Sequence, residues 1–159
     1  MTPPPTPVPD LADLPDTELL KLDHQVCFSL QAASRAFGGV YREALRDLGL
    51  TYPQYLAMMV LWEQGPLPVK TIGERLRLDS GTLSPLLKRL ESAGFVRRER
   101  SPEDERSVLV HLTDAGAGLR ERALPVPRSV LRATGLSVQE ILALQETLGR
   151  LTASLGRTG

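Results

Sequence analysis

The sequence predicts a mostly α-helical fold that carries one small β-hairpin in its second half. Most of the chain places apolar residues at steps of three and four, which is the spacing of helices with one buried face. Only residues 95–100 and 108–113 depart from this period, and both are short β-prone runs beside a turn-forming segment. The 159 residues are 42% hydrophobic and 24% charged, so we expect about one packed domain.

The N-terminal part of the chain combines a proline-rich segment with a long helical pattern. Six prolines in residues 1–15 predict an extended or disordered tail, because proline fixes the backbone and lacks an amide donor. Asp16 then resembles an N-cap, and the apolar spacing predicts one long amphipathic helix to about Asp47. Gly49 marks its end.

Three shorter helices are predicted in the middle of the chain. The first covers about 52–64 and has a proline in its first turn, and the second covers about 69–76. The third covers about 80–92 and is capped by Asp79 or Ser80, with an internal proline that only the start of a helix tolerates.

A hairpin and two further helices complete the predicted order. The two β-prone runs flank residues 101–105, whose composition favours a turn. A helix then opens at Thr113 and continues to about Leu131, bent at Pro125 and Pro127. Ser137 caps a last helix with one apolar side.

Short helices joined by a tight turn and followed by a hairpin describe a winged helix-turn-helix. We assign it to residues 49–112. The long flanking helices, 16–48 and 113–156, have apolar faces and little domain left to cover them. In so small a chain a second copy would bury these faces most simply, which predicts dimerisation through the N- and C-terminal helices.

Local charge supports binding of double-stranded DNA, although 19 basic residues balance 19 acidic ones overall. Basic residues gather on the last of the three short helices and on the hairpin, which is typical of a phosphate-contacting surface. The alternative is an ordinary solvated face, with Ser80 only capping its helix. The candidate DNA-binding residues are Ser80, Thr82, Ser84, Lys88, Arg97, Arg98, Asp104 and Arg106.

The hairpin tip is unusually acidic for an element that contacts DNA. One explanation is a salt bridge in which Asp104 braces Arg106 and directs its guanidinium into a minor groove. The alternative is a surface ion pair of little energetic value. A two-fold dimer would read a near-palindromic operator.

The single cysteine, Cys27, excludes an intramolecular disulfide framework and a multi-cysteine zinc site. With only two histidines as well, we predict no metal and no cofactor. A lone cysteine on an apolar helix is usually a buried, inert side chain. The opposing interpretation is a reactive thiol, which a protonated His24 one turn earlier would favour as thiolate.

Two tyrosines favour the reactive interpretation. Tyr41 follows Cys27 by 14 positions, which at about 100° per residue returns it to nearly the same helix face. At 1.5 Å per residue it lies about 21 Å away along a continuous helix, so contact requires an antiparallel second copy. Tyr52 would join from the same partner chain, and phenolic hydroxyls can donate to a thiolate. The alternative is interface packing with each hydroxyl at the edge.

No apolar run approaches the length of a membrane span, and the N-terminus lacks a basic stretch followed by an apolar one. We therefore expect a cytoplasmic protein that has no membrane partner and whose thiol starts out reduced.

At this point the motifs resemble those of the MarR family of winged-helix repressors. The resemblance rests on residues 78–91 (LDSGTLSPLLKRLE) and 100–107 (RSPEDERS). Residues 25–28 (QVCF), with Tyr41 and residues 51–55 (TYPQY), are similar to the organic hydroperoxide resistance regulators (OhrR), and the likeness covers about residues 20–150.

The resemblance implies a homodimeric transcriptional repressor of the one-cysteine type, not an enzyme. Cys27 would be the peroxide-reactive cysteine, and Tyr41 and Tyr52 would hydrogen-bond it from the partner subunit. Asp104 and Arg106 match the family's wing pair. Organic hydroperoxides would give a sulfenic acid, which a low-molecular-weight thiol converts to a mixed disulfide or which over-oxidises.

Two other functions are weighed against this one. The first is a repressor of the same family that a non-covalent small molecule relieves, with Cys27 structural. The second is a thiol peroxidase, for which the sequence shows neither a motif nor a second cysteine to complete a cycle.

Overall fold

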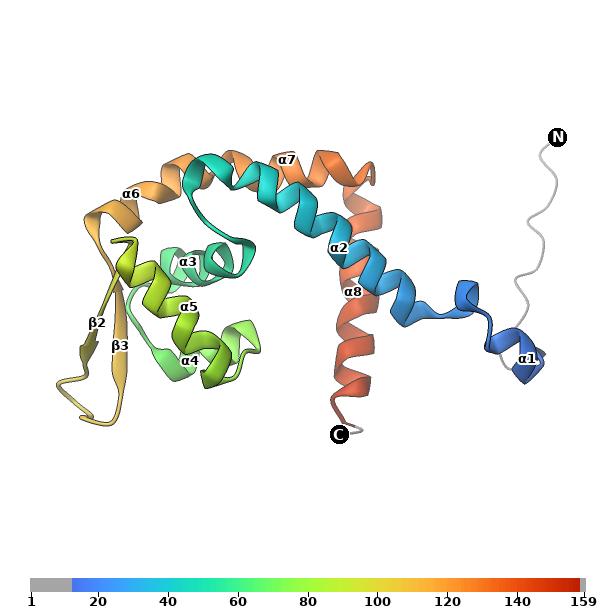
Figure 1. Ribbon diagram of the computed structural model, residues 1–159, viewed down its shortest axis with the longest axis horizontal. Helices are drawn as coiled ribbons and strands as arrows, with labels where there is room; N and C mark the ends of the chain where they lie inside the picture. The colour runs from blue at the N-terminus through green and yellow to red at the C-terminus, as the bar shows by residue number, and fades with distance from the viewer. Residues whose placement is uncertain (1–12, 158–159) are drawn as a thin grey trace. The chain divides into compact units, whose positions relative to one another are not determined.

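The computed structural model describes residues 13–157, which divide into two compact units between Gly39 and Val40 (Figure 1). The first unit holds α1 (Asp16–Leu19), a 3-10 turn, and the first part of α2 (Val26–Ala44). The second holds the remaining elements. Most of the predicted N-terminal tail, residues 1–12, lies outside the described part of the chain.

The prediction of one continuous helix from Asp16 to Asp47 is wrong, because the helix is interrupted before Val26. The Gln25 side chain donates to the carbonyl of Leu19 over 2.5 Å, and His24 Nδ1 lies 2.6 Å from the carbonyl oxygen of Glu18. These side chains occupy carbonyls that a continuous helix would bond to its own amides.

The cap of α1 also differs from the prediction. Pro15 occupies the N-cap position and makes no side-chain cap bond, and Asp16 is the first helical residue. At its other end α2 stops at Ala44, and a 3-10 turn (Arg46–Leu48) follows. The left-handed Gly49, at φ 66°, closes this turn as predicted.

The three predicted middle helices are confirmed and form the winged helix-turn-helix with the hairpin (Figure 1). The Thr51 hydroxyl accepts the amide of Gln54, whose side chain accepts the Thr51 amide, so a capping box starts the first of them. Their bounds and those of the strands are α3 (Tyr52–Gln64), β1 (Leu67–Pro68), α4 (Val69–Leu76), α5 (Ser80–Ser92), β2 (Val96–Arg100) and β3 (Val108–Leu112).

The sheet contains one strand that periodicity did not predict. β1 is only two residues long and pairs antiparallel with β3, opposite Val110 and Leu109. The sheet order is therefore β1-β3-β2, with β2 at an edge. In β2–β3 the register places Arg97 opposite His111 and Arg98 opposite Val110.

The core of the second unit lies between the helix-turn-helix and the sheet. Its most completely buried large side chains come from the residue directly after α2, from α3, α4 and α5, and from both hairpin strands. They are Leu45, Met58, Leu61, Ile72, Leu83, Leu87, Leu90, Val96 and Val110.

The C-terminal part forms three helices: α6 (Asp114–Ala123), α7 (Pro125–Thr134) and α8 (Val138–Leu155). The predicted single bent helix is thus two helices that break at Pro125. Pro127 does not bend the chain, because it lies in the first turn of α7, where amides have no helical partner. Ser137 caps α8, as predicted.

One glycine brings α6 against the start of the hairpin. Gly116 is buried, and a Cβ atom built on it would overlap the backbone carbonyl oxygen of Phe95. The Trp62 indole donates to the Gly116 carbonyl over 2.9 Å, and the amide of Thr113 donates to the Phe95 carbonyl over 3.1 Å. Any side chain at this position would push these backbones apart.

Candidate functional site

Helix α5 presents one apolar and one polar face. Leu83, Leu86, Leu87 and Leu90 are buried. The opposite face exposes the four side chains that the sequence nominated on this helix, Ser80, Thr82, Ser84 and Lys88, together with Arg89. Three small hydroxyl residues at the N-terminal end and a lysine one turn later suit the edge of a major groove.

Asp79 fixes where α5 begins. Its carboxylate accepts the amide of Thr82 over 2.8 Å, so Asp79 rather than Ser80 is the cap. The amide of Thr82 is the main cause that lowers the pKa of Asp79, and its side chain adds to this. The cap leaves the Ser80 hydroxyl on the solvent side of the helix start.

The pKa of Asp79 is lower in the folded protein than in the unfolded chain. The ionised carboxylate therefore stabilises the fold above about pH 4, which is the pKa of an aspartate in an unfolded chain. This stabilisation is lost as pH falls through the lower pKa of the folded protein. We expect Asp79→Ala to lower the melting temperature at pH 7 by about 2–4 °C. Thermal unfolding between pH 2.5 and 7 should show this difference narrowing below about pH 4.

Asp79→Ser is the matched control, because a serine hydroxyl caps a helix without titrating. It should retain most of the melting temperature at pH 7. Because its cap does not titrate, its small deficit relative to the parent should shrink or reverse below about pH 4, where the parent loses the contribution of the Asp79 carboxylate. An Asp79→Ala deficit that persists undiminished at pH 2.5 would show that the carboxylate charge is not what stabilises the helix start.

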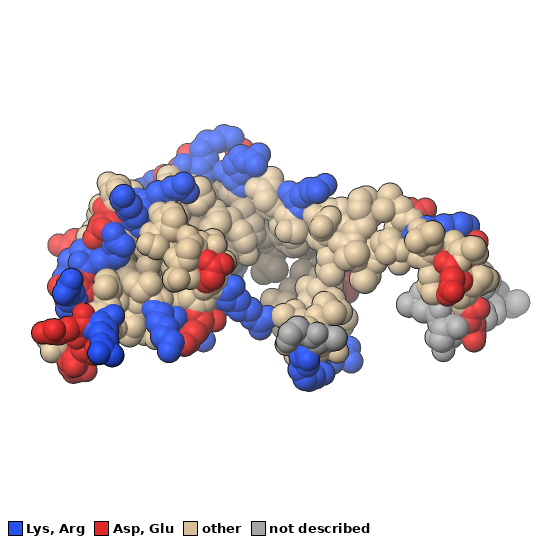
Figure 2. Space-filling model, turned by 60° about the horizontal axis from the view of Figure 1, so that its bottom comes forward, with Lys and Arg blue, Asp and Glu red and all other residues tan. Residues whose placement is uncertain are grey.

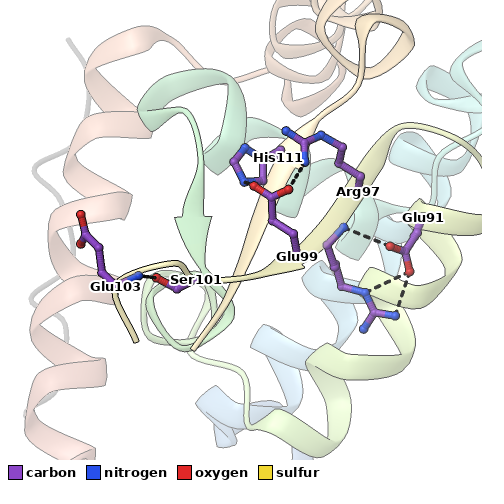
Figure 3. Close-up of polar contacts among 7 residues, drawn as sticks. Glu91, Arg97, Glu99, Ser101, Glu103 and His111 are labelled. Atoms are coloured by element: carbon purple, nitrogen blue, oxygen red, sulfur yellow. Dashed lines mark hydrogen bonds and ion pairs between the residues drawn. The ribbon is translucent and has the colours of Figure 1, made fainter. Parts of the chain in front are cut away.

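The hairpin tip is held by local hydrogen bonds. The Ser101 hydroxyl accepts the amide of Glu103 over 3.3 Å (Figure 3). It also accepts the amide of Asp104, over 3.4 Å. The amide of Ser101 donates to the Ser107 carbonyl over 2.8 Å, and the amide of Ser107 donates to the Asp104 carbonyl over 2.9 Å. These local bonds therefore define the shape of the loop.

The predicted salt bridge between Asp104 and Arg106 is wrong. Asp104 Oδ1 accepts the backbone amide of Arg106 over 3.0 Å, and among residues 13–157 no ion pair joins their side chains. An aspartate in a turn bonds the amide two residues ahead more easily than a distant guanidinium. Asp104 thus shapes the turn, and the exposed Arg106 side chain projects from it.

The two arginines nominated on β2 lie on opposite faces of the hairpin. Arg98 shares its face with the buried Val96, and its guanidinium and amide both bond Glu91 of α5. Arg97 lies on the other face and pairs with Glu99, whose carboxylate also lies 2.7 Å from His111 Nε2 (Figure 3).

The winged part is not a uniformly basic surface. Lys and Arg side chains are interspersed with Asp and Glu side chains on the face drawn in Figure 2. Hydrogen bonds from the Arg98 side chain, and then from its amide, lower the pKa of Glu91, so this carboxylate is charged at neutral pH. The positive charge of Arg98 is therefore largely compensated within the protein. Within residues 13–157, no ion pair compensates the charge of Lys88 or Arg106.

Cys27 is the second residue of α2 and is exposed in the protomer. The burial that the inert interpretation expected is therefore not found within the protomer, and whether the thiol is inert or reactive stays a prediction. His24 lies outside α2, and its ring contacts the Glu18 carbonyl. α2 runs without a break from Val26 to Ala44, the continuity that the partner-chain argument requires.

The two predicted tyrosines come together in the second unit. The ring centroids of Tyr41 and Tyr52 are 4.3 Å apart, and those of Tyr41 and Tyr55 are 6.0 Å apart. Burial, and then the neighbouring Tyr52, raise the pKa of Tyr41, so its phenol is protonated at neutral pH. A protonated phenol can donate a hydrogen bond to an anion. Contact between these phenols and Cys27 stays a prediction, because it would form between two chains.

Tyr55 belongs to the same cluster and was missed as a site residue. It is 3% exposed, and its ring also meets Trp62 edge-on at 6.3 Å. Its pKa is raised by burial and then by Tyr41 and Tyr52. The spacing of three between Tyr52 and Tyr55 on a helix was the available signal.

Comparison with known proteins gives consistent results. Residues 50–108 match the model of the MarR family. The chain is 47% identical over 136 residues to the organic hydroperoxide resistance transcriptional regulator of Bacillus subtilis (strain 168), covering 86% of this chain and 92% of that protein. It is 51% identical over 134 residues to the HTH-type transcriptional regulator TtmR of Methylorubrum extorquens (strain PA1), covering 84% and 69%.

Solved structures of AbfR from Staphylococcus epidermidis are also similar. Reduced AbfR bound to DNA superposes with a TM-score of 0.75 at 36% identity, covering 89% of this chain and 99% of that one. Overoxidized AbfR bound to DNA gives 0.72 at 36% identity, covering 87% and 98%. Within residues 13–157, no helix combines the length and apolarity needed to cross a bilayer.

Proposed function

The chain belongs to the MarR family of transcriptional regulators, and we propose that it is a redox-sensing repressor that binds operator DNA as a homodimer while Cys27 is reduced. Oxidation of Cys27 by an organic hydroperoxide then releases the DNA. The observation that carries this proposal is the exposed thiol of the chain's one cysteine, at the start of α2. A relative at 47% identity is named for organic hydroperoxide resistance, which supports the choice of oxidant.

Exposed apolar side chains support the homodimer. Among the described residues, α2, α7 and α8 expose large hydrophobic side chains that a soluble monomer would leave in water. They are Val26, Phe28, Phe37, Leu131, Val138, Leu142, Leu144 and Leu155. A second copy would bury these side chains and bring Tyr41 and Tyr52 of one protomer to Cys27 of the other, as the helix spacing predicts.

The proposed chemistry is stoichiometric. The Cys27 thiolate attacks the terminal oxygen of the hydroperoxide, the O–O bond breaks, and a proton completes the alcohol that leaves. The sulfur loses two electrons and becomes a sulfenic acid, while the hydroperoxide gains them. A small thiol then condenses with the sulfenic acid to form a mixed disulfide and water, since the chain holds no second cysteine.

Two features of this position suit the proposed chemistry. The N-terminal end of a helix carries partial positive charge, and Cys27 lies in the first turn of α2. The protonated phenols supply donors from the partner. A bulky mixed disulfide at the interface would separate the helices and change the spacing of the two DNA-reading lobes.

The DNA interface in this proposal consists of α5 and the hairpin. Ser80, Thr82, Ser84 and Lys88 would face the major groove, and Arg106 would enter the adjacent minor groove. We expect Arg106→Ala to weaken operator binding about tenfold, or ~1.4 kcal/mol. The slope of log affinity against log salt should fall by about one unit, which titrations at several salt concentrations measure.

Arg46→Ala is the control for Arg106→Ala. It removes the same charge from an exposed side chain that lies outside α5 and the hairpin and pairs with Glu43. Its affinity and salt slope should stay within about twofold of the parent protein. If both variants weaken binding equally, Arg106 contributes through the long-range electrostatic field of the protein and not through a contact in the minor groove.

The proposed function is tested by titrating the operator complex with an organic hydroperoxide such as cumene hydroperoxide. DNA affinity should fall as the mass of the Cys27 peptide increases, first by one oxygen and then, with a small thiol present, by the mass of the mixed disulfide. Unchanged affinity at full oxidation of Cys27 would contradict the proposal.

A second candidate, relief by a non-covalent ligand, is favoured by a cleft between α3 and the α6–α7 segment. Its volume is about 310 Å³, and it is lined by aromatic, aliphatic and charged side chains. These include Tyr55, Met59, Trp62, Arg120 and Leu124. Release of DNA by a small molecule that leaves Cys27 unmodified would support this candidate.

A further inference from the structure

The last turn of α5 and the middle of β2 are joined by a cluster of hydrogen bonds. Glu91 Oε2 accepts from Nε and Nη2 of Arg98, at 3.1 and 2.9 Å. Glu91 Oε1 accepts the backbone amide of Arg98 over 3.0 Å (Figure 3). The Arg98 side chain is 28% exposed and the Glu91 side chain 37%, so both are partly shielded from solvent. Because Glu91 binds both the guanidinium and the backbone amide of Arg98, it restrains the position and the direction of β2 relative to α5.

The amide of Arg98 can reach Glu91 because of the strand register. The amide of Thr113 donates to the Phe95 carbonyl at one end of the hairpin, and that of Ser101 to the Ser107 carbonyl at the other. Bonded and non-bonded pairs alternate in an antiparallel ladder, so Arg98, opposite Val110, turns its amide away from β3. β2 is an edge strand, and Glu91 supplies the acceptor that a neighbouring strand would otherwise provide.

Apolar packing accompanies these polar contacts. Val96, two residues before Arg98 on the same face of β2, is 2% exposed, and Leu90, beside Glu91, is fully buried. Between them the chain turns through Gly94, at φ 81°, and the amide of Phe95 donates to the Leu90 carbonyl over 3.1 Å. The end of α5 and the start of β2 therefore share core and backbone bonds, and the Glu91–Arg98 contact extends this restraint outward along the strand.

We propose that Glu91 and Arg98 are positioning residues that fix the hairpin to the DNA-reading helix α5, so that both elements meet DNA as one rigid lobe. This inference rests on the proposed function and deepens it. It gives Arg98 a different role from the phosphate contact expected from sequence, because the guanidinium is already bonded to a carboxylate. It also means that a change at the dimer interface moves α5 and the hairpin of each protomer together and leaves the hairpin fixed relative to α5.

The effect of removing Glu91 separates this role from simple electrostatics. Loss of a negative charge from a DNA-facing lobe should tighten binding if only the field matters. If Glu91 positions the hairpin, Glu91→Ala should weaken binding despite the gain in net positive charge. We expect about a tenfold rise in the dissociation constant for a duplex selected from random DNA by the unmodified protein.

Hydroxyl-radical footprinting on the same duplex locates the loss. In Glu91→Ala, protection of the outer minor-groove positions read by the hairpin should weaken, while central protection by α5 persists at saturating protein. A uniform loss of protection would indicate general destabilisation and overturn the positioning role. Arg98→Gln should reproduce the Glu91→Ala pattern, and the double variant should stay within about twofold of either single variant, because both remove one contact.

Glu99→Ala is the matched control. It removes a carboxylate that also pairs with an arginine of β2, but on the opposite face of the hairpin and without contact to α5. It should bind DNA as tightly as the parent or more tightly. Additive effects of the Glu91 and Arg98 variants, or a Glu91→Ala variant that binds at least as tightly as the parent, would overturn the proposal.

Hydrogen exchange in the DNA-free protein tests the contact independently of DNA binding. The Arg98 amide should exchange at least tenfold faster in Glu91→Ala, with the more conservative Glu91→Gln intermediate, while the buried Val110 amide keeps its rate. An unchanged rate at Arg98 would overturn the proposal even if DNA binding is normal. Failure of the unmodified protein to select any duplex would instead reject the proposed function and leave this exchange result as the decisive one for the contact.

Discussion

Cys27→Ser should bind operator DNA with an affinity within about threefold of the parent protein and should not respond to organic hydroperoxides. Serine nearly preserves the volume of the side chain, so the interface and the DNA-reading lobes keep their arrangement. Its hydroxyl cannot follow the thiol to a sulfenic acid. Under the same treatment the parent protein should lose at least tenfold in affinity, or ~1.4 kcal/mol. Fluorescence anisotropy with a labelled operator measures both.

Methionine oxidation is the competing source of a peroxide response. The chain has three methionines, of which Met59 is 41% exposed and Met58 is buried. Met59→Leu should therefore respond to hydroperoxide like the parent, and Cys27→Ser should remain insensitive until the peroxide concentration oxidises methionine. If Cys27→Ser still releases DNA at concentrations that oxidise no methionine, the sensor lies elsewhere.

Gly116→Ala should be the most destabilising glycine-to-alanine substitution within residues 13–157. The added Cβ would overlap the carbonyl oxygen of Phe95, and backbone cannot move aside as a flexible side chain does. We expect a loss of about 3 kcal/mol in the free energy of unfolding. Moving α6 away from the hairpin would also lengthen the bond from the Trp62 indole to the Gly116 carbonyl. Chemical denaturation at a fixed protein concentration measures the loss.

Gly118→Ala is the same substitution two residues further along α6. Gly118 is exposed, and a Cβ there meets nothing within 4 Å. Alanine favours the helix over glycine, so this variant should gain about 0.5–1 kcal/mol. Opposite signs for the two variants would confirm that close approach, and not helix propensity, determines the residue at 116. Similar values for both would contradict this explanation.

Three of the correctly predicted helices begin at a local signal in the sequence. α3, α5 and α8 begin at side chains that cap their first turn, namely Thr51, Asp79 and Ser137. Such caps act within four residues, so a reader of the sequence can find them. The interruption before Val26 has no comparable signal, because it depends on Gln25 and His24 reaching back to carbonyls. β1 is too short for any period.

Some features of the candidate site could likewise be predicted from the sequence, and others could not. Exposure of the polar face of α5 follows from helical spacing. The different environments of Arg97 and Arg98 follow from strand alternation once Val96 is known to be buried, so this signal was present in the sequence. The bond from Asp104 to an amide rather than to a guanidinium depends on the turn geometry, which residue types alone do not specify. The proposed meeting of Cys27 with two phenols would depend on a second chain.

The loop of residues 101–107 closes on itself through hydrogen bonds of Ser101, Asp104 and Ser107. Its geometry is consequently encoded within seven consecutive residues. Variation at Pro102, Glu103 and Glu105 can therefore accumulate during evolution at little cost to the folding of the rest of the chain. If the hairpin tip contacts DNA as proposed, exchanging these few residues would be enough to change the flanking bases that the protein prefers.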